Sequence, residues 1–239
     1  DREFPQIAAA LLDSQCPSLM QPVPSISVAE LALDPTQGKV TAGYRVPRHT
    51  VLVARAANGE TCRMRTAWDN VLWPLSITDV RLSGASTLCL QINCSEGLTL
   101  NELALDSLRL HLHGDWMSTM PLYEMLVSAV VGVDVMDAAG IVHHLPRTAW
   151  REVGYEDDQA VLPNPPHAAA AYGLLQEYFS FPGKFHFFDV TGLAGRLDRH
   201  AGRTFFGRGH GRSALRALLV PADRHVPPGH HPGGGADAF

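Results

Sequence analysis

Apolar residues near the start of the chain recur at the spacing of one helical face. They are Phe4, Ile7, Leu11, Leu12 and Cys16. Steps of three and four residues bring side chains to the same side of an α-helix. Pro17, followed by Pro22 and Pro24, disfavours continuation of the helix. The pattern therefore predicts a helix over residues 4–16.

Between residues 26 and 113 the apolar positions mostly recur at every second residue, which is the period of a β-strand. Asn58-Gly59 supplies the positive backbone angles that a tight hairpin turn needs. The predicted strands share this alternation, and they cover residues 26–33, 51–55, 61–66, 75–82, 88–94 and 108–112. We expect this part of the chain to be mostly antiparallel sheet.

A few helices are expected to interrupt or follow the sheet. Ser118 or Thr119, followed by Pro121, has the form of a capped helix start. A further hairpin is predicted by the apolar residues of 133–135 and 140–142. The fold class that follows is α+β and mostly antiparallel β, a sandwich-like β domain with a few inserted helices.

Proline-rich residues 163–166 mark a candidate boundary, after which residues 168–179 predict a helix and residues 185–190 a strand. From Gly192 onward the chain is rich in glycine, histidine and arginine, with no sustained period except in residues 214–220. The expected divisions are the end of an N-terminal helical region (1–24), a β-rich domain (25–162), the start of a second mixed α/β subdomain (163–193) and a disordered or non-native tail (194–239).

Charge and composition exclude some classes of protein. Residues 1–190 carry 12 basic and 21 acidic side chains, whereas residues 191–239 carry 7 and 3. Binding of nucleic-acid phosphates depends on clustered Lys and Arg, so the acidic main body argues against a nucleic-acid partner. No stretch approaches 18 uninterrupted apolar residues, which argues against membrane insertion.

The four cysteines contain no CxxC pair and are too sparse for a disulfide scaffold, which favours a reducing cytoplasm. The opening residues 1–16 resemble the inside of an amphipathic helix, and we expect that a natural start precedes Asp1.

Histidines and acidic residues are the first candidates for chemistry. His111 and His113 point to one face of a predicted strand, and His143-His144 follow later, but no further ligand lies at a metal-site spacing. We interpret these histidines as surface residues and residues 156–158, which are all acidic, as a solvated loop. The sequence has no GxSxG, HExxH, Walker or strand-linked GxGxxG motif. We expect that the protein is not an enzyme and that it binds no cofactor.

Aromatic residues are concentrated between residues 172 and 188, where the positive charge is too low for a base-stacking surface. The segment YGLLQEYFSFPGKF, followed by FFD, closely resembles the signature of the TssF (VasA/ImpG) family. Its signature residues are Tyr172, Leu175, Gln176, Glu177, Tyr178, Phe179, Phe181, Pro182, Lys184, Phe185 and Phe188. Residues 1–10, 22–27, 41–48, 62–74 and 155–163 resemble further blocks of the family in the same order. We interpret the signature as one that specifies packing.

The resemblance implies a structural role in the baseplate of the type VI secretion system. The family resembles the wedge proteins of contractile phage baseplates, and the implied partners are TssG, a second TssF copy, TssK and TssE. The resemblance implies no catalytic or metal-binding residues. The alternative from another class is a β-rich module that binds a carbohydrate or small ligand, and an enzyme is third. A concave site with convergent polar groups would favour these alternatives.

The residue-by-residue resemblance ends at about Leu193. The family continues with a mixed strand and helix region, whereas the arginine- and glycine-rich composition here is typical of a GC-rich gene read in another frame. The hypothesis is that residues after Leu193 are frameshifted or otherwise non-native, and sequencing the gene tests it.

Overall fold

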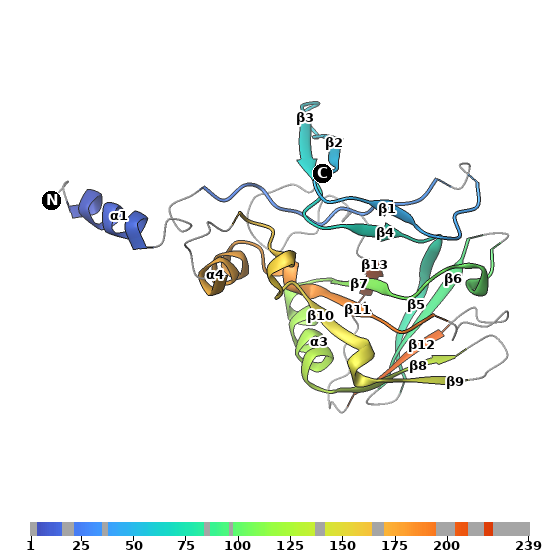
Figure 1. Ribbon diagram of the computed structural model, residues 1–239. Helices are drawn as coiled ribbons and strands as arrows, with labels where there is room; N and C mark the ends of the chain where they lie inside the picture. The colour runs from blue at the N-terminus through green and yellow to red at the C-terminus, as the bar shows by residue number, and fades with distance from the viewer. Residues whose placement is uncertain are drawn as a thin grey trace.

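Two antiparallel sheets form the body of the protein (Figure 1). The computed structural model describes residues 4–15, 22–34, 38–83, 87–95, 98–136, 142–163, 170–194, 204–209 and 218–221. The four-stranded sheet has the order β10 (Trp150–Val153), β11 (Phe187–Val190), β7 (Leu108–His113) and β13 (Leu218–Pro221). The five-stranded sheet has the order β5 (Leu75–Ser83), β6 (Thr87–Cys94), β12 (Thr204–Gly209), β8 (Val130–Met136) and β9 (Val142–Pro146).

The hydrophobic core contains residues of both sheets because alternate residues of their strands are apolar. Leu90 and Ile92 of β6 belong to the same buried cluster as Leu110 and Leu112 of β7. Phe188 of β11, which is fully buried, joins them. Burial of such side chains stabilises the fold by about 1.5–3 kcal/mol each. The architecture confirms the predicted α+β class with mostly antiparallel sheet.

Helix α3 (Trp116–Ser128) packs Leu122 and Leu126 into this core. Its N-cap is Asp115, whose carboxylate accepts a hydrogen bond from the Ser118 backbone N–H at 3.1 Å. The predicted start at Ser118 or Thr119 was therefore late by about one turn, because Asp115 supplies an earlier cap.

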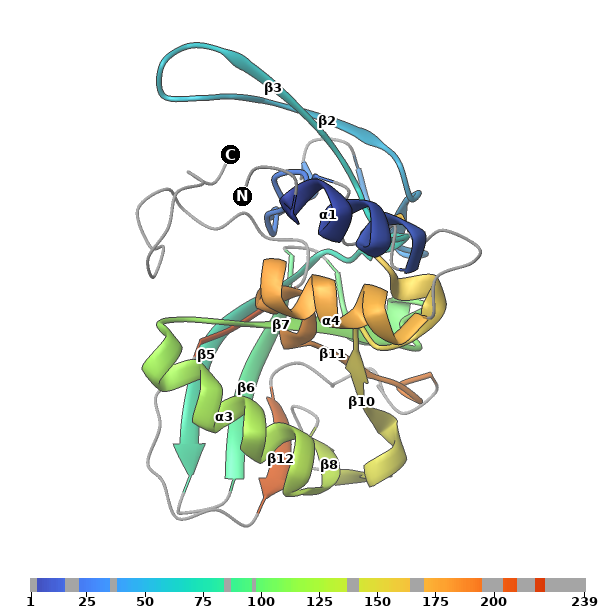
Figure 2. The same ribbon diagram turned by 90° about the vertical axis from the view of Figure 1, so that its left-hand side faces the viewer.

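A further layer lies over the outer face of the four-stranded sheet. It contains a two-stranded sheet of β1 (Tyr44–Val46) and β4 (Asn70–Leu72). The hairpin of β2 (Val51–Arg55) and β3 (Thr61–Arg65) stands away from this layer (Figures 1 and 2). Gly59, with a φ of 85°, forms its turn as the sequence predicts. We call residues 51–65 the β2–β3 arm.

Two helices lie outside the sandwich. Helix α1 (Phe4–Gln15) matches the first predicted helix apart from its last residue, and it lies far from the sheets in Figure 1. Helix α4 (Ala170–Ser180) lies on the side of the molecule that faces the viewer in Figure 2, as α1 does. Short 3-10 helices are η2 (Leu100–Glu102), η3 (Arg147–Ala149), η4 (Asp157–Gln159) and η5 (Pro182–His186). Among the described residues, no helix is both long and apolar enough to span a membrane.

Two further predictions, about one strand and about the division into domains, differ from the structure before residue 194. Residues 26–33 form no strand. The apolar alternation is present in this segment, but in the described part of the chain no strand lies beside it to form a backbone ladder. The boundary at residues 163–166 does not separate two cores: Phe188, Val190 and Leu193 belong to the cluster that contains β6 and β7. Strand β11 brings these residues into the sheet between β10 and β7.

The expectation of an irregular tail after residue 193 is wrong at two strands. Strand β12 pairs with β6 on one side and with β8 on the other, and β13 pairs with β7. The ladders are formed by backbone hydrogen bonds, which do not require a particular side-chain pattern. The composition of this segment therefore gave no signal for these strands. The rest of residues 195–239 lies outside the described residues, and there the expectation stays a prediction.

Candidate protein–protein interface

A buried ion pair lies at the centre of the aromatic segment 172–188. Glu177 on α4 and Lys184 on η5 are 3% and 2% exposed, and the Lys184 ammonium donates a hydrogen bond to Glu177 Oε2. The other carboxylate oxygen of Glu177 accepts the backbone N–H groups of Val161 and Leu162, each at 2.7 Å. All of these contacts satisfy charges that would be costly to bury alone.

The pair is enclosed by neighbours that leave little space. The Lys184 ammonium lies 5.0 Å from the ring centroid of Phe185, which is itself buried. Gly154 passes close to this turn with a φ of 112°, and a Cβ built on it would lie 3.0 Å from the Lys184 carbonyl oxygen. A side chain at position 154 therefore requires the turn to shift, so glycine is required there.

The segment that Glu177 holds is also the support for the base of the β2–β3 arm. The Arg48 guanidinium donates to the carbonyl oxygen of Ala160 at 2.9 Å and to that of Asp158 at 3.4 Å. The Trp68 indole N–H donates to the Gln159 carbonyl oxygen at 2.8 Å. A chain of polar contacts therefore joins the ion pair to the segments that precede β2 and follow β3.

Asp69 fixes the same base from the other side. Its carboxylate accepts the Arg48 backbone N–H at 2.6 Å and the Arg45 guanidinium at 2.7 Å. These two contacts, the backbone one first, hold the pKa of Asp69 below its usual value of 3.8. The carboxylate is therefore charged at neutral pH and keeps its role as an acceptor.

The outward side of α4 is apolar and uncovered. Leu175 is 53% exposed and Phe179 is 80% exposed, and Tyr172 and Tyr178 are each nearly half exposed. Residues 172, 175 and 179 are separated by three and four positions, so they form one stripe on the helix. Exposed apolar stripes of this kind mark surfaces that bind other proteins. We call these four residues the α4 face.

The signature residues thus divide between the interior and the surface. Glu177, Lys184, Phe185 and Phe188 are buried. Gln176, Phe181 and Pro182 are partly buried. Tyr172, Leu175, Tyr178 and Phe179 are exposed, which differs from the interpretation that the whole signature specifies packing. A helix that packs on one side leaves its other side outward, and the residue types alone did not distinguish the two.

The prediction of surface histidines is wrong for His111, which is 5% exposed. Its strand has leucines on the core face, as predicted, but the opposite face is covered too. The His111 ring lies 4.3 Å from the ring of Phe187, and the Trp68 ring lies 5.2 Å from Phe187 on the same face. His113 is half-buried and the rings of His113 and His186 each lie 6.4 Å from His111.

The burial of His111 predicts acid sensitivity. Burial, with a smaller contribution from the nearby His186 and His113, lowers the pKa of His111 from 6.5 to about 3. The unfolded chain binds this proton below about pH 6.5 and the folded chain does not, so stability is lost as pH falls through this window. At about 1.4 kcal/mol per pH unit, the loss reaches about 2 kcal/mol near pH 5. We expect His111→Phe to remove this loss, as measured by urea unfolding at about pH 5 and pH 7.

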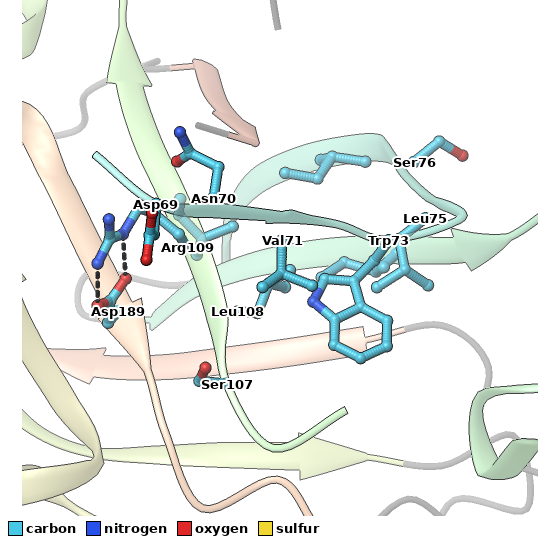
Figure 3. Close-up of a pocket in the computed structure, with 13 residues that line it drawn as sticks. Asp69, Asn70, Val71, Trp73, Leu75, Ser76, Ser107, Leu108, Arg109 and Asp189 are labelled. Carbon is cyan, nitrogen blue, oxygen red and sulfur yellow. Dashed lines mark hydrogen bonds and ion pairs between the residues drawn. The ribbon is translucent and has the colours of Figure 1, made fainter. Parts of the chain in front are cut away.

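A cavity of about 220 Å³ tests the ligand-binding alternative (Figure 3). Its Arg109 and Asp189 are paired with each other through two hydrogen bonds, at 2.7 and 2.8 Å, and its Asn70 donates to the carbonyl oxygen of Trp68. The cavity is smaller than the roughly 300–1,000 Å³ of ligand sites. Its geometry does not favour a carbohydrate or small-ligand site.

Metal chemistry has no support from the described ranges, where no three His, Cys, Asp or Glu side chains are grouped to hold a metal ion. The acidic residues 156–158 form part of η4 and its cap and are exposed, as predicted for a solvated loop.

The fold and its surface define an antiparallel β protein with an uncovered helix face and a projecting hairpin. A family model described as "Type VI secretion system, TssF" matches residues 1–219. The chain therefore belongs to the TssF family of the type VI secretion system. The match continues past Leu193, where the residue-by-residue resemblance was expected to end, and residues 220–239 lie outside it.

Two relatives extend the comparison. The chain is 32% identical over 219 residues to "Type VI secretion system component TssF1" of Pseudomonas aeruginosa, covering 83% of this chain and 35% of that protein. Its fold is similar, with a TM-score of 0.71 and 22% identity, to a chain in a cryo-electron microscopy structure of the TssK-TssF-TssG baseplate subcomplex. That similarity covers 93% of this chain and 45% of the other. The chain thus spans less than half the length of either relative.

Several residues that hold the base of the β2–β3 arm were not singled out by the sequence. Arg48, Trp68 and Asp69 lie in blocks that resemble the family, but their partners are far along the chain. Arg48 and Ala160 are 112 positions apart, and Trp68 and Gln159 are 91 apart. No local pattern reports such a contact.

Proposed function

We propose that the protein is a structural subunit of a type VI secretion baseplate in the cytoplasm, and that it works by binding other proteins. The observation that carries the proposal is the match of the TssF family model across residues 1–219. The proposed partners are TssG and TssK, which are named together with TssF in the subcomplex that contains the structurally similar chain. TssE and a second TssF copy are proposed from the family resemblance.

The α4 face supports a binding role and is proposed as the surface that TssG covers. Phe179 and Leu175 leave a large apolar area in water, which a partner subunit would remove from solvent. The helix is held firmly behind that face because Glu177 and Lys184 fix it to the sandwich. Rigid apolar residues bind with a smaller entropy cost than mobile ones.

A role without catalysis fits the arrangement of the polar groups. The Arg109–Asp189 pair and the Glu177–Lys184 pair each neutralise themselves, so neither offers a reactive group to a substrate. We propose that both pairs serve to hold the fold.

The experiment is co-expression with affinity-tagged TssG from the same gene cluster. The double substitution Leu175→Ser and Phe179→Ser is expected to reduce recovery of the chain on TssG at least about tenfold, since loss of central apolar contacts costs more than about 1 kcal/mol each. The matched control is Met117→Ser on α3, which is 79% exposed and also apolar. Recovery of this control should equal that of the unchanged chain.

Two results would count against the proposal. Absence of the unchanged, folded chain from purified TssG would remove TssG as the partner. Equal recovery of the α4 double variant and the Met117→Ser control would remove the α4 face as the surface.

A further inference from the structure

The β2–β3 arm has two chemically different faces. Cross-strand pairing aligns Val51 with Arg65, Val53 with Arg63 and Arg55 with Thr61, so these six side chains share one face. We call it the arginine face. The opposite face contains Leu52, Ala54, Cys62 and Met64, which are partly buried. Val51 and Val53 are 63% and 64% exposed.

The arginine face concentrates positive charge on an acidic protein. Arg63 and Arg65 are two residues apart on one strand, which separates them by about 7 Å. Arg55 lies diagonally across from Arg63 on the same face. Within the described ranges none of the three forms an ion pair, and Glu60 of the arm is hydrogen-bonded to Asn58 in the turn. The like charges of the three arginines repel one another, and an acidic ligand would reduce this repulsion.

The arm is fixed at its base and open along its length. Thr66 Oγ1 donates to the Pro47 carbonyl oxygen at 2.8 Å and accepts the Thr50 backbone N–H at 3.0 Å. Beyond this base, β2 and β3 pair only with each other in the described part of the chain. Both views show the hairpin projecting from the body (Figures 1 and 2). A two-stranded hairpin alone is marginally stable in water, so an added strand or surface would stabilise it.

The chemistry of this face selects one class of partner. The three arginines favour a partner with an anionic surface. The two valines between them favour a partner with apolar side chains, which the phosphate backbone of a nucleic acid lacks. Open strand edges accept an extended peptide through backbone hydrogen bonds. The acidic residues of the main body also repel a nucleic acid.

We propose that the β2–β3 arm binds an acidic, extended segment of another protein, with the arginine face providing charge recognition. The site is separate from the α4 face. The inference deepens the proposed function, because it gives the chemistry of a second contact with a partner. It rests on the proposed function in one respect, which is that the partner is a protein.

The test measures binding of fluorescently labelled poly-L-glutamate by anisotropy at low and moderate salt. The unchanged protein is expected to bind, and the charge reversals Arg63→Glu and Arg65→Glu together are expected to weaken binding at least about tenfold. The control reverses Arg81 and Arg151, which are exposed outside the arm and change the net charge equally. Its affinity should stay within about twofold.

A conservative variant keeps the test informative if the reversals disturb folding. Arg63→Lys with Arg65→Lys preserves the charge and should retain most of the affinity. The proposal is overturned if the unchanged protein does not bind poly-L-glutamate, if the arm reversals bind as well as the control, or if double-stranded DNA binds more tightly. Because no baseplate subunit is used, these outcomes are independent of the TssG experiment.

Discussion

Replacing Lys184 by Met is expected to lower the free energy of unfolding by about 3–5 kcal/mol. The substitution keeps the buried aliphatic volume and removes only the ammonium, so the Glu177 carboxylate is left 3% exposed with no cation beside it. Its two backbone N–H donors from Val161 and Leu162 remain, but they do not neutralise the charge. Urea unfolding at neutral pH measures the loss.

The double variant Lys184→Met with Glu177→Gln is the matched control. The glutamine amide at position 177 still offers a carbonyl oxygen to the two backbone N–H groups and carries no charge, so most of the lost stability should return. If the single and double variants are equally unstable, the loss comes from the shape of the site and not from the unpaired charge of Glu177. If Lys184→Met is as stable as the unchanged protein, the pair does not hold the segment.

The second large effect separates two phenylalanines of the same signature. Phe188 is fully buried and stacks on Trp150 with ring centroids 5.0 Å apart, so Phe188→Ala should cost about 3–5 kcal/mol through lost burial and the cavity left behind. Phe179 is 80% exposed, so Phe179→Ala should change stability by less than about 0.5 kcal/mol. Thermal or urea unfolding of both variants measures the difference. Similar losses at the two positions would contradict the division of the signature into interior and surface.

Elements with local chemical signals could be predicted from the sequence. The Asn58-Gly59 turn and the alternating leucines of β6 and β7 predict a hairpin and strands that the structure contains. Strand β12 carries no such signal, because its ladders with β6 and β8 are made by the backbone. Residues 26–33 show the opposite case: the pattern is present, but no strand pairs with them in the described ranges. The alternation of apolar and polar residues indicates which face of a strand could be buried. Whether the strand forms depends on a pairing segment that lies elsewhere in the sequence.

The candidate interface could be predicted only in part. The residue types of the signature were visible, and so was the resemblance that they carry. The buried partner of Glu177 lies seven residues away across a turn, and the residues that Arg48 and Trp68 contact lie more than ninety positions away. His111 looked exposed for the same reason, since the cover over its face comes from Trp68 and Phe187. Contacts between residues so far apart in the sequence can be identified only once the fold is known.

The most direct measurement of the central claim is site-specific photo-crosslinking in cells that carry an intact type VI secretion gene cluster. The variant Phe179→p-benzoylphenylalanine keeps an aromatic group on the α4 face, and Met117→p-benzoylphenylalanine is its control on α3. We expect a crosslinked product that contains TssG from position 179 and none from position 117. No product from position 179 in cells that assemble the apparatus, or the same product from both positions, would contradict this expectation.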